Sequence, residues 1–199
     1  WARRRLAGRV RFERERWETP DGDFVDVDFA PGAGPLLVLF HGLEGSTASH
    51  YALSFALEAR RRGWGFAMPH FRGCSGELNR APRAYHSGDH AEVGWLLARL
   101  AARAGGPVYA AGVSLGGNAL LRWAAEAGAD AAALARAAAA ICSPLDLTAS
   151  GHAMGRGFNR HVYTRMFLAT MKPKALAKWL QHPGLFDRER LARARTLYE

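Results

Sequence analysis

One serine in this sequence lies in a setting that suits nucleophilic catalysis. Ser114 stands between Gly112 and Gly116 in the pattern G-x-S-x-G, after the apolar run VYAAGV and before the helix-like run LGGNALLRWAAEA. A strand, a sharp turn and a helix in this order hold a serine hydroxyl exposed above the end of a sheet. In so tight a turn, side chains at the two glycines would collide with neighbouring backbone. The pattern therefore predicts that Ser114 is a nucleophile that forms a covalent intermediate.

A second stretch, residues 41–45 (HGLEG), directly follows the apolar run LLVLF. An acyl-transfer site needs N–H donors that stabilise the oxyanion of the tetrahedral intermediate, each contributing about 2.7–4 kcal/mol. We expect these donors to be the main-chain amides of Leu43 and Leu115, supported by Gly42. His41 precedes the nucleophile and lies in the loop itself, so we expect it to hold the loop by hydrogen bonds rather than to act as the general base.

The elements that must position these residues alternate between strands and helices. Residues 24–30 alternate with a period of two, which predicts a half-exposed strand. Residues 36–40 form a continuous apolar run, which is typical of a strand buried on both faces. Short β–α connections of this kind predict an α/β fold, with a mostly parallel sheet flanked by helices and ligands bound at the carboxyl ends of the strands. The other predicted strands are 64–68, 108–113 and 137–142, and the predicted helices are 51–62, 89–104 (opened by an Asp89/Glu92 capping box) and 115–127.

These elements divide the chain into three stretches. Residues 1–149 are expected to form the N-terminal core that carries the serine turn. The pattern of residues 150–185 predicts helices and no new strand. These helices are either a cap over the site or an ordinary flanking layer. Residues 186–199 are expected to begin a C-terminal part, with a helix from Arg188 to Tyr198. The first residue is Trp1 rather than Met, which leaves open whether a segment precedes it.

Length and charge narrow the class of protein. A chain of 199 residues with 49% hydrophobic content can bury one substantial core, so a single domain is expected. The net charge is +9, but arginines are spread through the whole chain, and the dense N-terminal cluster is interleaved with Glu13 and Glu15. A nucleic-acid-binding face needs clustered charge with base-reading groups. The pattern therefore favours a solvated basic surface and no nucleic-acid partner.

Hydropathy and cysteine usage favour a cytoplasmic protein. No apolar stretch is long enough to span a bilayer, and the basic N-terminus leads into no apolar signal region. Cys74 and Cys142 have no metal-ligand spacing, and two thiols make no disulfide framework. We expect both to be small buried side chains in a reducing compartment, and we expect neither a metal nor a cofactor.

Several stretches together resemble a known family. They are HGLEG, FRGCSGELNR (71–80), YHSGD (85–89), GVSLGGN (112–118), SPLDL (143–147) and RGFNR (156–160). In this order they are similar to the YheT-like α/β-hydrolases, also called the AB hydrolase 4 family, and the likeness covers most of the chain. The resemblance implies a carboxylesterase- or lipase-like enzyme acting on small-molecule acyl esters, with acyltransferase relatives. It also implies a Ser–Asp–His triad in which Ser114 is the serine.

The other two members of that triad have no match in this sequence. In the family, the acid and the histidine follow later strands, and this sequence ends at Glu199 before such strands. We therefore expect a chain truncated at its C-terminus, with the acid and the base beyond Glu199 and little activity of its own. Asp146 is a conceivable substitute acid, although capping the following segment is its simpler role. The downstream histidines are His152, His161 and His182, and they match no triad position.

The sequence also offers other candidate sites and functions. His86 and His90 have helical i, i+4 spacing, but Gly88 and Asp89 interrupt a helical presentation of metal ligands. Cys74 lacks a basic partner that would make it a nucleophile. The main alternatives to an ester hydrolase are a scaffold that binds without turnover and an acyltransferase using the same serine. The sequence predicts no oligomeric state.

Overall fold

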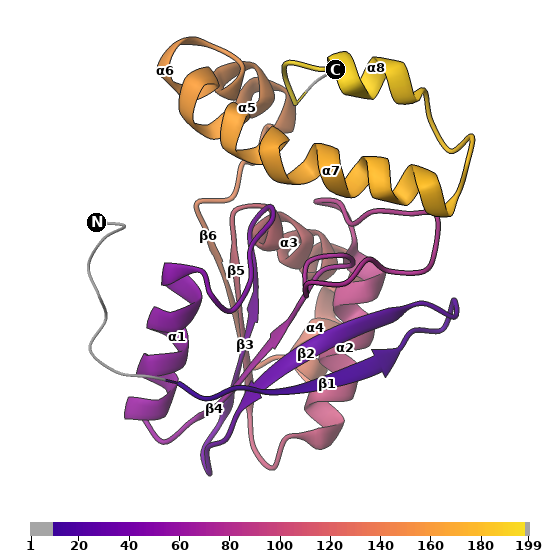
Figure 1. The fold of residues 1–199 in the computed structure, drawn as a ribbon. Coiled ribbons are helices and arrows are strands. Elements are labelled where there is room, and N and C mark those ends of the chain that lie inside the picture. The colour runs from indigo at the N-terminus through magenta and orange to yellow at the C-terminus, as the bar shows by residue number, and fades with distance from the viewer. Residues whose placement is uncertain (1–9, 198–199) are drawn as a thin grey trace. The chain divides into compact units, whose positions relative to one another are not determined.

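A six-stranded sheet is the centre of the computed structural model, which describes residues 10–197 (Figure 1). The strands lie side by side in the order β1-β2-β4-β3-β5-β6. Strands β4, β3, β5 and β6 are parallel, whereas β1 and β2 form an antiparallel hairpin and β2 pairs antiparallel with β4. Their bounds are β1 Glu13–Glu18, β2 Phe24–Ala30, β3 Leu36–Phe40, β4 Gly65–Pro69, β5 Val108–Val113 and β6 Ala137–Ile141.

Helices cover both faces of this sheet, which confirms the predicted fold class. Helix α1 (His50–Arg61) lies on one face, and α2 (His90–Arg103) and α3 (Leu115–Ala127) lie on the other (Figure 1). Central strand β3 shows why its sequence is continuously apolar. Leu39 packs in the core under α1, whereas Val38 and Phe40 pack in the core under α2 and α3. Successive side chains of a strand point to opposite faces, so both parities must be apolar.

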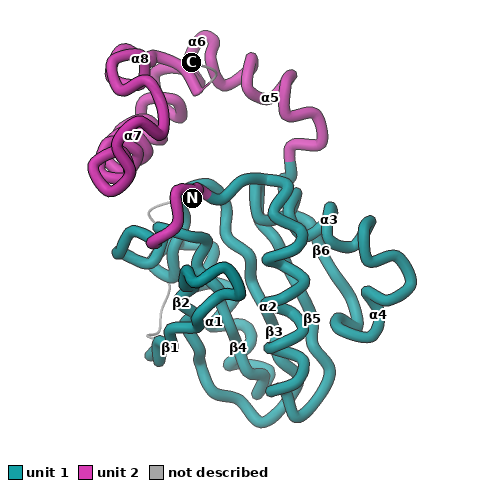
Figure 2. Tube along the Cα trace, turned by 90° about the vertical axis from the view of Figure 1, so that its right-hand side faces the viewer, with its two compact units in different colours: residues 1–79, 85–143 teal, residues 80–84, 144–199 magenta. Residues whose placement is uncertain are grey.

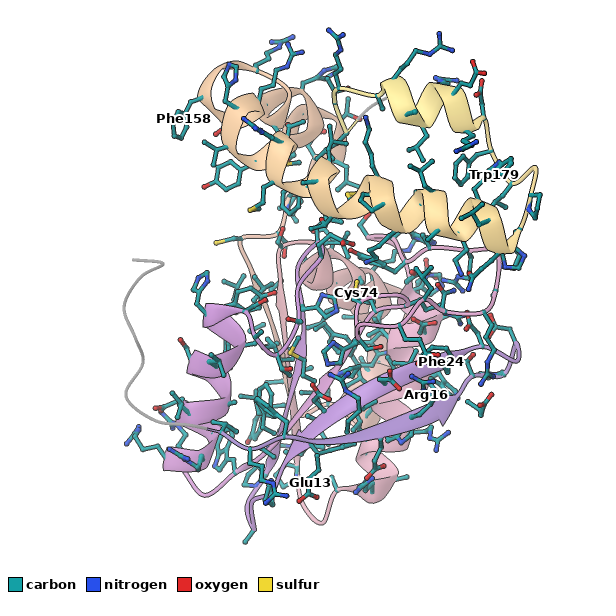
Figure 3. All side chains as sticks on the ribbon, viewed as in Figure 1. Glu13, Arg16, Phe24, Cys74, Phe158 and Trp179 are labelled. Carbon is teal, nitrogen blue, oxygen red and sulfur yellow. The ribbon has the colours of Figure 1, made fainter. Side chains whose placement is uncertain are left out.

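The prediction that residues 24–30 form a half-exposed strand is wrong. Asp26 and Asp28, on the polar side of β2, are 3% and 2% exposed. Arg16 pairs with Asp26 through two hydrogen bonds of 2.8 and 3.0 Å, and Arg14 pairs with Asp28 in the same way at 2.7 and 2.9 Å. Arg16 also lies over the ring of Phe24, 3.8 Å from its centroid (Figure 3). A buried charge requires hydrogen bonds, and here two sets of donors supply them. Arg14 and Arg16 come from β1, and His70 and Ser75 come from the segment after β4.

The predicted capping box before α2 is also wrong. Asp89 directly precedes the helix, but its carboxylate accepts no hydrogen bond from the helix amides. It accepts instead from the main-chain amide of His86, at 2.7 Å. Glu92 accepts from the buried side chain of Arg72 at 2.6 Å, and Arg72 also pairs with Asp23 at 2.9 Å. Both carboxylates therefore hold loops rather than the helix end.

The chain separates into two compact units, shown in teal and magenta in Figure 2. The first unit, Trp1–Asn79 with Tyr85–Ser143, contains the sheet and its helices, ending with η1 (Gly128–Asp130), α4 (Ala131–Leu134) and β6. The second unit, Arg80–Ala84 with Pro144–Glu199, is helical, and none of its residues up to 197 is in a strand. Its helices are α5 (Leu147–Met154), α6 (Gly157–Asn159), the π-helix η2 (Arg160–Thr164), α7 (Arg165–Gln181) and α8 (Arg188–Arg193).

Within the second unit, a few polar contacts join the helices. Thr164 Oγ1 donates to Met154 O at 2.7 Å, and Trp179 Nε1 donates to Phe186 O at 3.2 Å (Trp179 is labelled in Figure 3). The last predicted helix begins at Arg188 but ends at Arg193, and its expected end at Tyr198 lies outside the described residues, as does the basic stretch 1–9. Among residues 10–197, no helix combines the length and the apolar composition needed to cross a membrane.

Candidate active site

Ser114 occupies a strained turn between β5 and α3. Its backbone dihedrals are φ 53° and ψ −118°, a conformation that side-chain-bearing residues rarely adopt. Two hydrogen bonds hold the turn: Ser114 N donates to Ile141 O on β6 at 2.8 Å, and Asn118 N donates to Ser114 O at 3.1 Å. A strained non-glycine residue that the surrounding structure holds in place is typical of functional sites.

The glycines on either side of Ser114 are sterically required. A Cβ atom at Gly112 would lie 2.5 Å from Gly116 O and 2.6 Å from Gly117 Cα. A Cβ atom at Gly116 would collide with the main-chain oxygens of Phe40 and His41, at the end of β3. Helix α3 thus begins in direct contact with the backbone of the neighbouring strand, and this close approach sets where the serine stands.

The loop of residues 41–45 lies beside the serine. Strands β3 and β5 are neighbours, with Phe40 opposite Gly112, so both chains leave the sheet at the same edge. A Cβ atom at Gly42 would lie 3.3 Å from Ser114 Cβ. Leu115 is the first residue of α3, where main-chain N–H groups have no acceptor within the helix. The amides of Leu43 and Leu115 therefore belong to the two backbone segments that meet at the serine.

His41 is fully buried, and both of its ring nitrogens are engaged. Nε2 accepts a hydrogen bond from Phe71 N at 2.9 Å, and Nδ1 lies 2.7 Å from Gly42 O. Because a main-chain N–H can only donate, Nε2 is the unprotonated nitrogen and the proton is on Nδ1, where it is donated to Gly42 O. His41 thus joins its own loop to the segment after β4, and it has no lone pair left to accept the serine proton.

With this geometry in place, comparison with known proteins identifies the family. The family model described as the alpha/beta hydrolase fold matches residues 35–169, more than half of the chain. The chain belongs to the α/β-hydrolase fold family. The match spans β3, the serine turn and the helices up to α7.

Curated relatives of this α/β-hydrolase are considerably longer than the sequence. It is 43% identical over 176 residues to YheT of Escherichia coli (strain K12), a protein for which esterase activity is proposed, and the match covers 85% of this chain and 51% of YheT. This bears out the resemblance to the YheT-like hydrolases. It is 27% identical to the embryogenesis-associated protein EMB8 of Picea glauca, covering 89% of this chain and 41% of EMB8. The chain thus spans about half the length of the curated relatives it matches.

Solved structures with low sequence identity share the α/β-hydrolase fold. Alpha/beta hydrolase domain-containing protein 10 from mouse aligns with a TM-score of 0.57 at 18% identity, over 71% of this chain and 54% of that one. The Pyrococcus furiosus esterase Pf2001 aligns with a TM-score of 0.57 at 15% identity, over 83% of this chain and 63% of that one. At these identities, the likeness concerns the fold alone.

Asp146 and the histidines that follow Ser114 in the sequence of this α/β-hydrolase lie in the second unit. Asp146 is the N-cap of α5, where its carboxylate accepts a hydrogen bond from Ala149 N at 2.8 Å. His152 lies in α5 and His161 in η2. His182 follows α7, and its Nε2 lies 2.7 Å from Arg80 O. Asp146 thus caps the following helix, as expected from the simpler of its two predicted roles.

The cysteine prediction fails for one residue. Cys74 is partly buried, but Cys142 is exposed, because it follows β6 at the edge of the sheet. His86 and His90 bond locally: His86 Nδ1 accepts from Gly88 N at 3.0 Å, and His90 Nδ1 lies 3.0 Å from Gly88 O. Among residues 10–197, no three His, Cys, Asp or Glu side chains are grouped so that they could hold a metal ion.

Sequence reasoning missed the side chains that hold the loop beside Ser114. Gly42 N donates to the hydroxyl of Tyr51 at 3.0 Å, and Glu44 N donates to the hydroxyl of Tyr85 at 2.8 Å. Thr47, further along the same loop, donates to Asp28 Oδ2 at 2.8 Å. Tyr85 lies in the YHSGD stretch, which carries a family resemblance but gives no local indication of a role.

Asp28 is the centre of the polar network under this loop. It accepts hydrogen bonds from Arg14, from His70 Nε2 at 2.8 Å and from Thr47. Burial raises the pKa of Asp28, but the hydrogen bonds from Arg14, His70 and Thr47 outweigh it and hold the pKa well below its usual range. The carboxylate is therefore ionised at neutral pH and joins β1, the loop after β3 and the end of β4.

Proposed function

We propose that the protein hydrolyses carboxylic esters through an acyl intermediate on Ser114. The observation that carries this proposal is the strained Ser114 at the start of α3, in contact with the loop of residues 41–45. The similarity to YheT, for which esterase activity is proposed, supports the same chemical class. A scaffold that only binds has no need of a serine held at positive φ beside a second loop, so these contacts favour an enzyme.

The proposed reaction has two steps. Ser114 Oγ attacks the ester carbonyl carbon and loses its proton to a histidine base, and the amides of Leu43 and Leu115 donate hydrogen bonds to the oxyanion that forms. The ester C–O bond then breaks, the alcohol leaves with that proton, and the acyl group stays on Ser114. Water then gives a proton to the same histidine and attacks the acyl carbon; the bond from that carbon to Ser114 Oγ breaks, the histidine returns the proton to Oγ, and the acid leaves.

The base and its acid partner are proposed to lie outside the printed sequence. His41 is fully engaged by Gly42 and Phe71, and Asp146 caps α5. The match covers 51% of YheT and 41% of EMB8, so each relative contains a further part of chain outside it. We therefore propose that further strands of the complete protein carry the triad acid and histidine.

A fluorophosphonate probe tests the proposal directly. The protein expressed from its complete reading frame should be labelled, and peptide mass spectrometry should place the label on Ser114. Ser114→Ala should abolish labelling and lower kcat for a p-nitrophenyl ester by roughly a millionfold. Labelling that persists in Ser114→Ala would overturn the proposal, and a folded protein that neither reacts nor turns over esters would favour a binding scaffold.

The printed chain alone provides a second test. Residues 1–199, expressed by themselves, should turn over the same ester at a rate several orders of magnitude below that of the complete protein, because serine is a weak nucleophile without a base. Equal activity of the two forms would place the base within residues 1–199 and return attention to His152, His161 and His182.

A further inference from the structure

The amides of the loop beside Ser114 are almost all engaged. Gly42 N donates to Tyr51 Oη, Glu44 N donates to Tyr85 Oη, and Gly45 N donates to Gly42 O at 3.0 Å. The amide of Leu43 lies between two of these and, within residues 10–197, donates to no protein acceptor. The two tyrosine hydroxyls therefore leave the Leu43 amide as the donor that this loop can offer to a ligand.

Tyr85 holds both the main chain and the side chain of Glu44. Its hydroxyl accepts from Glu44 N at 2.8 Å and donates to Glu44 Oε1 at 2.8 Å. Glu44 has φ 56°, a left-handed conformation that costs a residue other than glycine roughly 1–2 kcal/mol. A hydroxyl that bonds both ends of the same residue offsets that cost, and it fixes the orientation of the peptide that follows Leu43.

The ring of Tyr85 is itself held in the core of the first unit. It stacks on Phe71 with centroids 5.3 Å apart and an interplanar angle of 6°, and it meets the ring of His41 edge-on at 6.3 Å. Burial, with Cys74 and Glu44 nearby, raises the pKa of Tyr85 far above its usual range. The phenol therefore keeps its proton at neutral pH, and with it the donor to Glu44.

We propose that Tyr85 is a positioning residue that aims the Leu43 amide at the oxyanion by holding Glu44. The inference rests on the acyl-serine chemistry proposed above and adds a residue outside both the serine turn and the oxyanion loop. Tyr51 holds the residue before Leu43, because its hydroxyl accepts a hydrogen bond from Gly42 N. A donor that is misaimed in the transition state lowers kcat while leaving ground-state binding of the ester almost unchanged.

Tyr85→Phe removes only the hydroxyl and keeps the ring stacked on Phe71. In the protein expressed from its complete reading frame, we expect kcat for a p-nitrophenyl ester and the rate of Ser114 labelling to fall by roughly ten- to a hundredfold. KM should stay close to wild type, and the midpoint of thermal unfolding should fall by only a few degrees, because the hydroxyl no longer offsets the strain at Glu44. The matched control is Tyr109→Phe: Tyr109 stacks on Trp64 at 5.1 Å, at the far end of β5 from Ser114, and both rates should be unchanged.

Variants at Glu44 separate positioning from simple loss of stability. Glu44→Gln keeps a carbonyl oxygen that can accept from Tyr85, so it should retain most of the wild-type kcat. Glu44→Gly relieves the strain of positive φ but removes that acceptor, so its kcat should fall nearly as far as in Tyr85→Phe. The double variant Tyr85→Phe/Glu44→Gly should be no worse than Tyr85→Phe alone, because the hydroxyl lost in Tyr85→Phe makes both hydrogen bonds to Glu44.

The outcomes separate this inference from the proposed function. If wild-type Ser114 is labelled and Tyr85→Phe is labelled at the same rate, the positioning role is overturned and the esterase proposal stands. A change confined to KM, or a higher kcat in Glu44→Gly, would also overturn it. If wild-type Ser114 does not react, the proposed function and this inference fail together.

Discussion

Gly42 and Ser114 are in steric contact although 72 positions separate them in the sequence: a Cβ atom at Gly42 would lie 3.3 Å from Ser114 Cβ and 3.3 Å from Val113 O. The contact follows from the pairing of β3 with β5, which brings Phe40 opposite Gly112 and delivers both following segments to one edge of the sheet. A residue larger than glycine at position 42 must therefore displace either the loop or the serine turn.

Gly42→Ala should lower activity without unfolding the protein. The neighbouring atoms must move by a few tenths of an ångström, and misplacement of about 1 Å costs about a hundredfold in rate, so we expect kcat and the rate of fluorophosphonate labelling to fall about tenfold. Gly106→Ala, which meets no atom within 4 Å, is the control. A wild-type labelling rate in Gly42→Ala would show that the contact does not limit the chemistry.

Gly116→Ala should instead destabilise the fold. The new methyl group would collide with the main-chain oxygens of Phe40 and His41, which cannot rotate away as a side chain can. Overpacking of this kind costs about 1–3 kcal/mol and more where backbone is displaced. Urea unfolding should show a loss of at least about 3 kcal/mol, whereas Gly105→Ala, with no atom within 4 Å, should unfold like the wild type. Equal midpoints for the two variants would contradict the close approach of α3 to β3.

Local pattern was sufficient for the serine turn and for the strands and longer helices between residues 24 and 142, but it did not predict β1 (Glu13–Glu18), the first strand of the hairpin. The strand of residues 108–113 was placed without error, because its apolar run ends at a glycine-flanked serine and leads directly into a helix. The burial of Asp26 and Asp28 could not be predicted in this way. Their partners, Arg14, Arg16 and His70, come from other strands and loops, and the alternation of β2 by itself is the same for an exposed polar face and for a buried, paired one.

In the candidate site, too, residues in short motifs could be predicted and residues that make long-range contacts could not. Ser114, His41 and the glycines could be proposed from the sequence because each is tied to a short motif with its own steric reason. Tyr51 and Tyr85 contact the loop only through their hydroxyls, across 9 and 41 positions, and such contacts leave no periodicity in the sequence. The triad acid and base remain a prediction, because Asp146 caps α5 and both ring nitrogens of His41 are engaged by Gly42 and Phe71.

Asp28 should make stability depend on acid pH. Its pKa is lower in the folded protein than the value of about 3.9 expected when unfolded, so the folded state binds fewer protons. The resulting stability is fully present above pH 4–5 and is lost as the pH falls towards the folded pKa. Urea unfolding between pH 3 and pH 7 should show this loss in the wild type. Asp28→Asn should be less stable by roughly 2–3 kcal/mol at pH 7 and should show a shallower decline towards pH 3. If the free energy of unfolding of both proteins fell equally between pH 7 and pH 3, Asp28 would not be the source of the acid dependence.

The free edge of β6 should make the printed chain self-associate when it is expressed alone. Strand β6 is the last in the sheet, and among residues 10–197 only β5 pairs with it. Its four alanines are exposed, so neither bulk nor charge prevents another strand from pairing with the free main-chain groups. Light scattering of residues 1–199 should therefore rise with concentration, and Ala139→Lys on β6 should reduce it. Ala132→Lys adds the same charge at an exposed position of α4, away from the edge, and should have little effect. If both lysines suppress association equally, net charge rather than the strand edge controls it; if the wild-type chain stays monomeric at high concentration, the edge is protected by another part of the molecule.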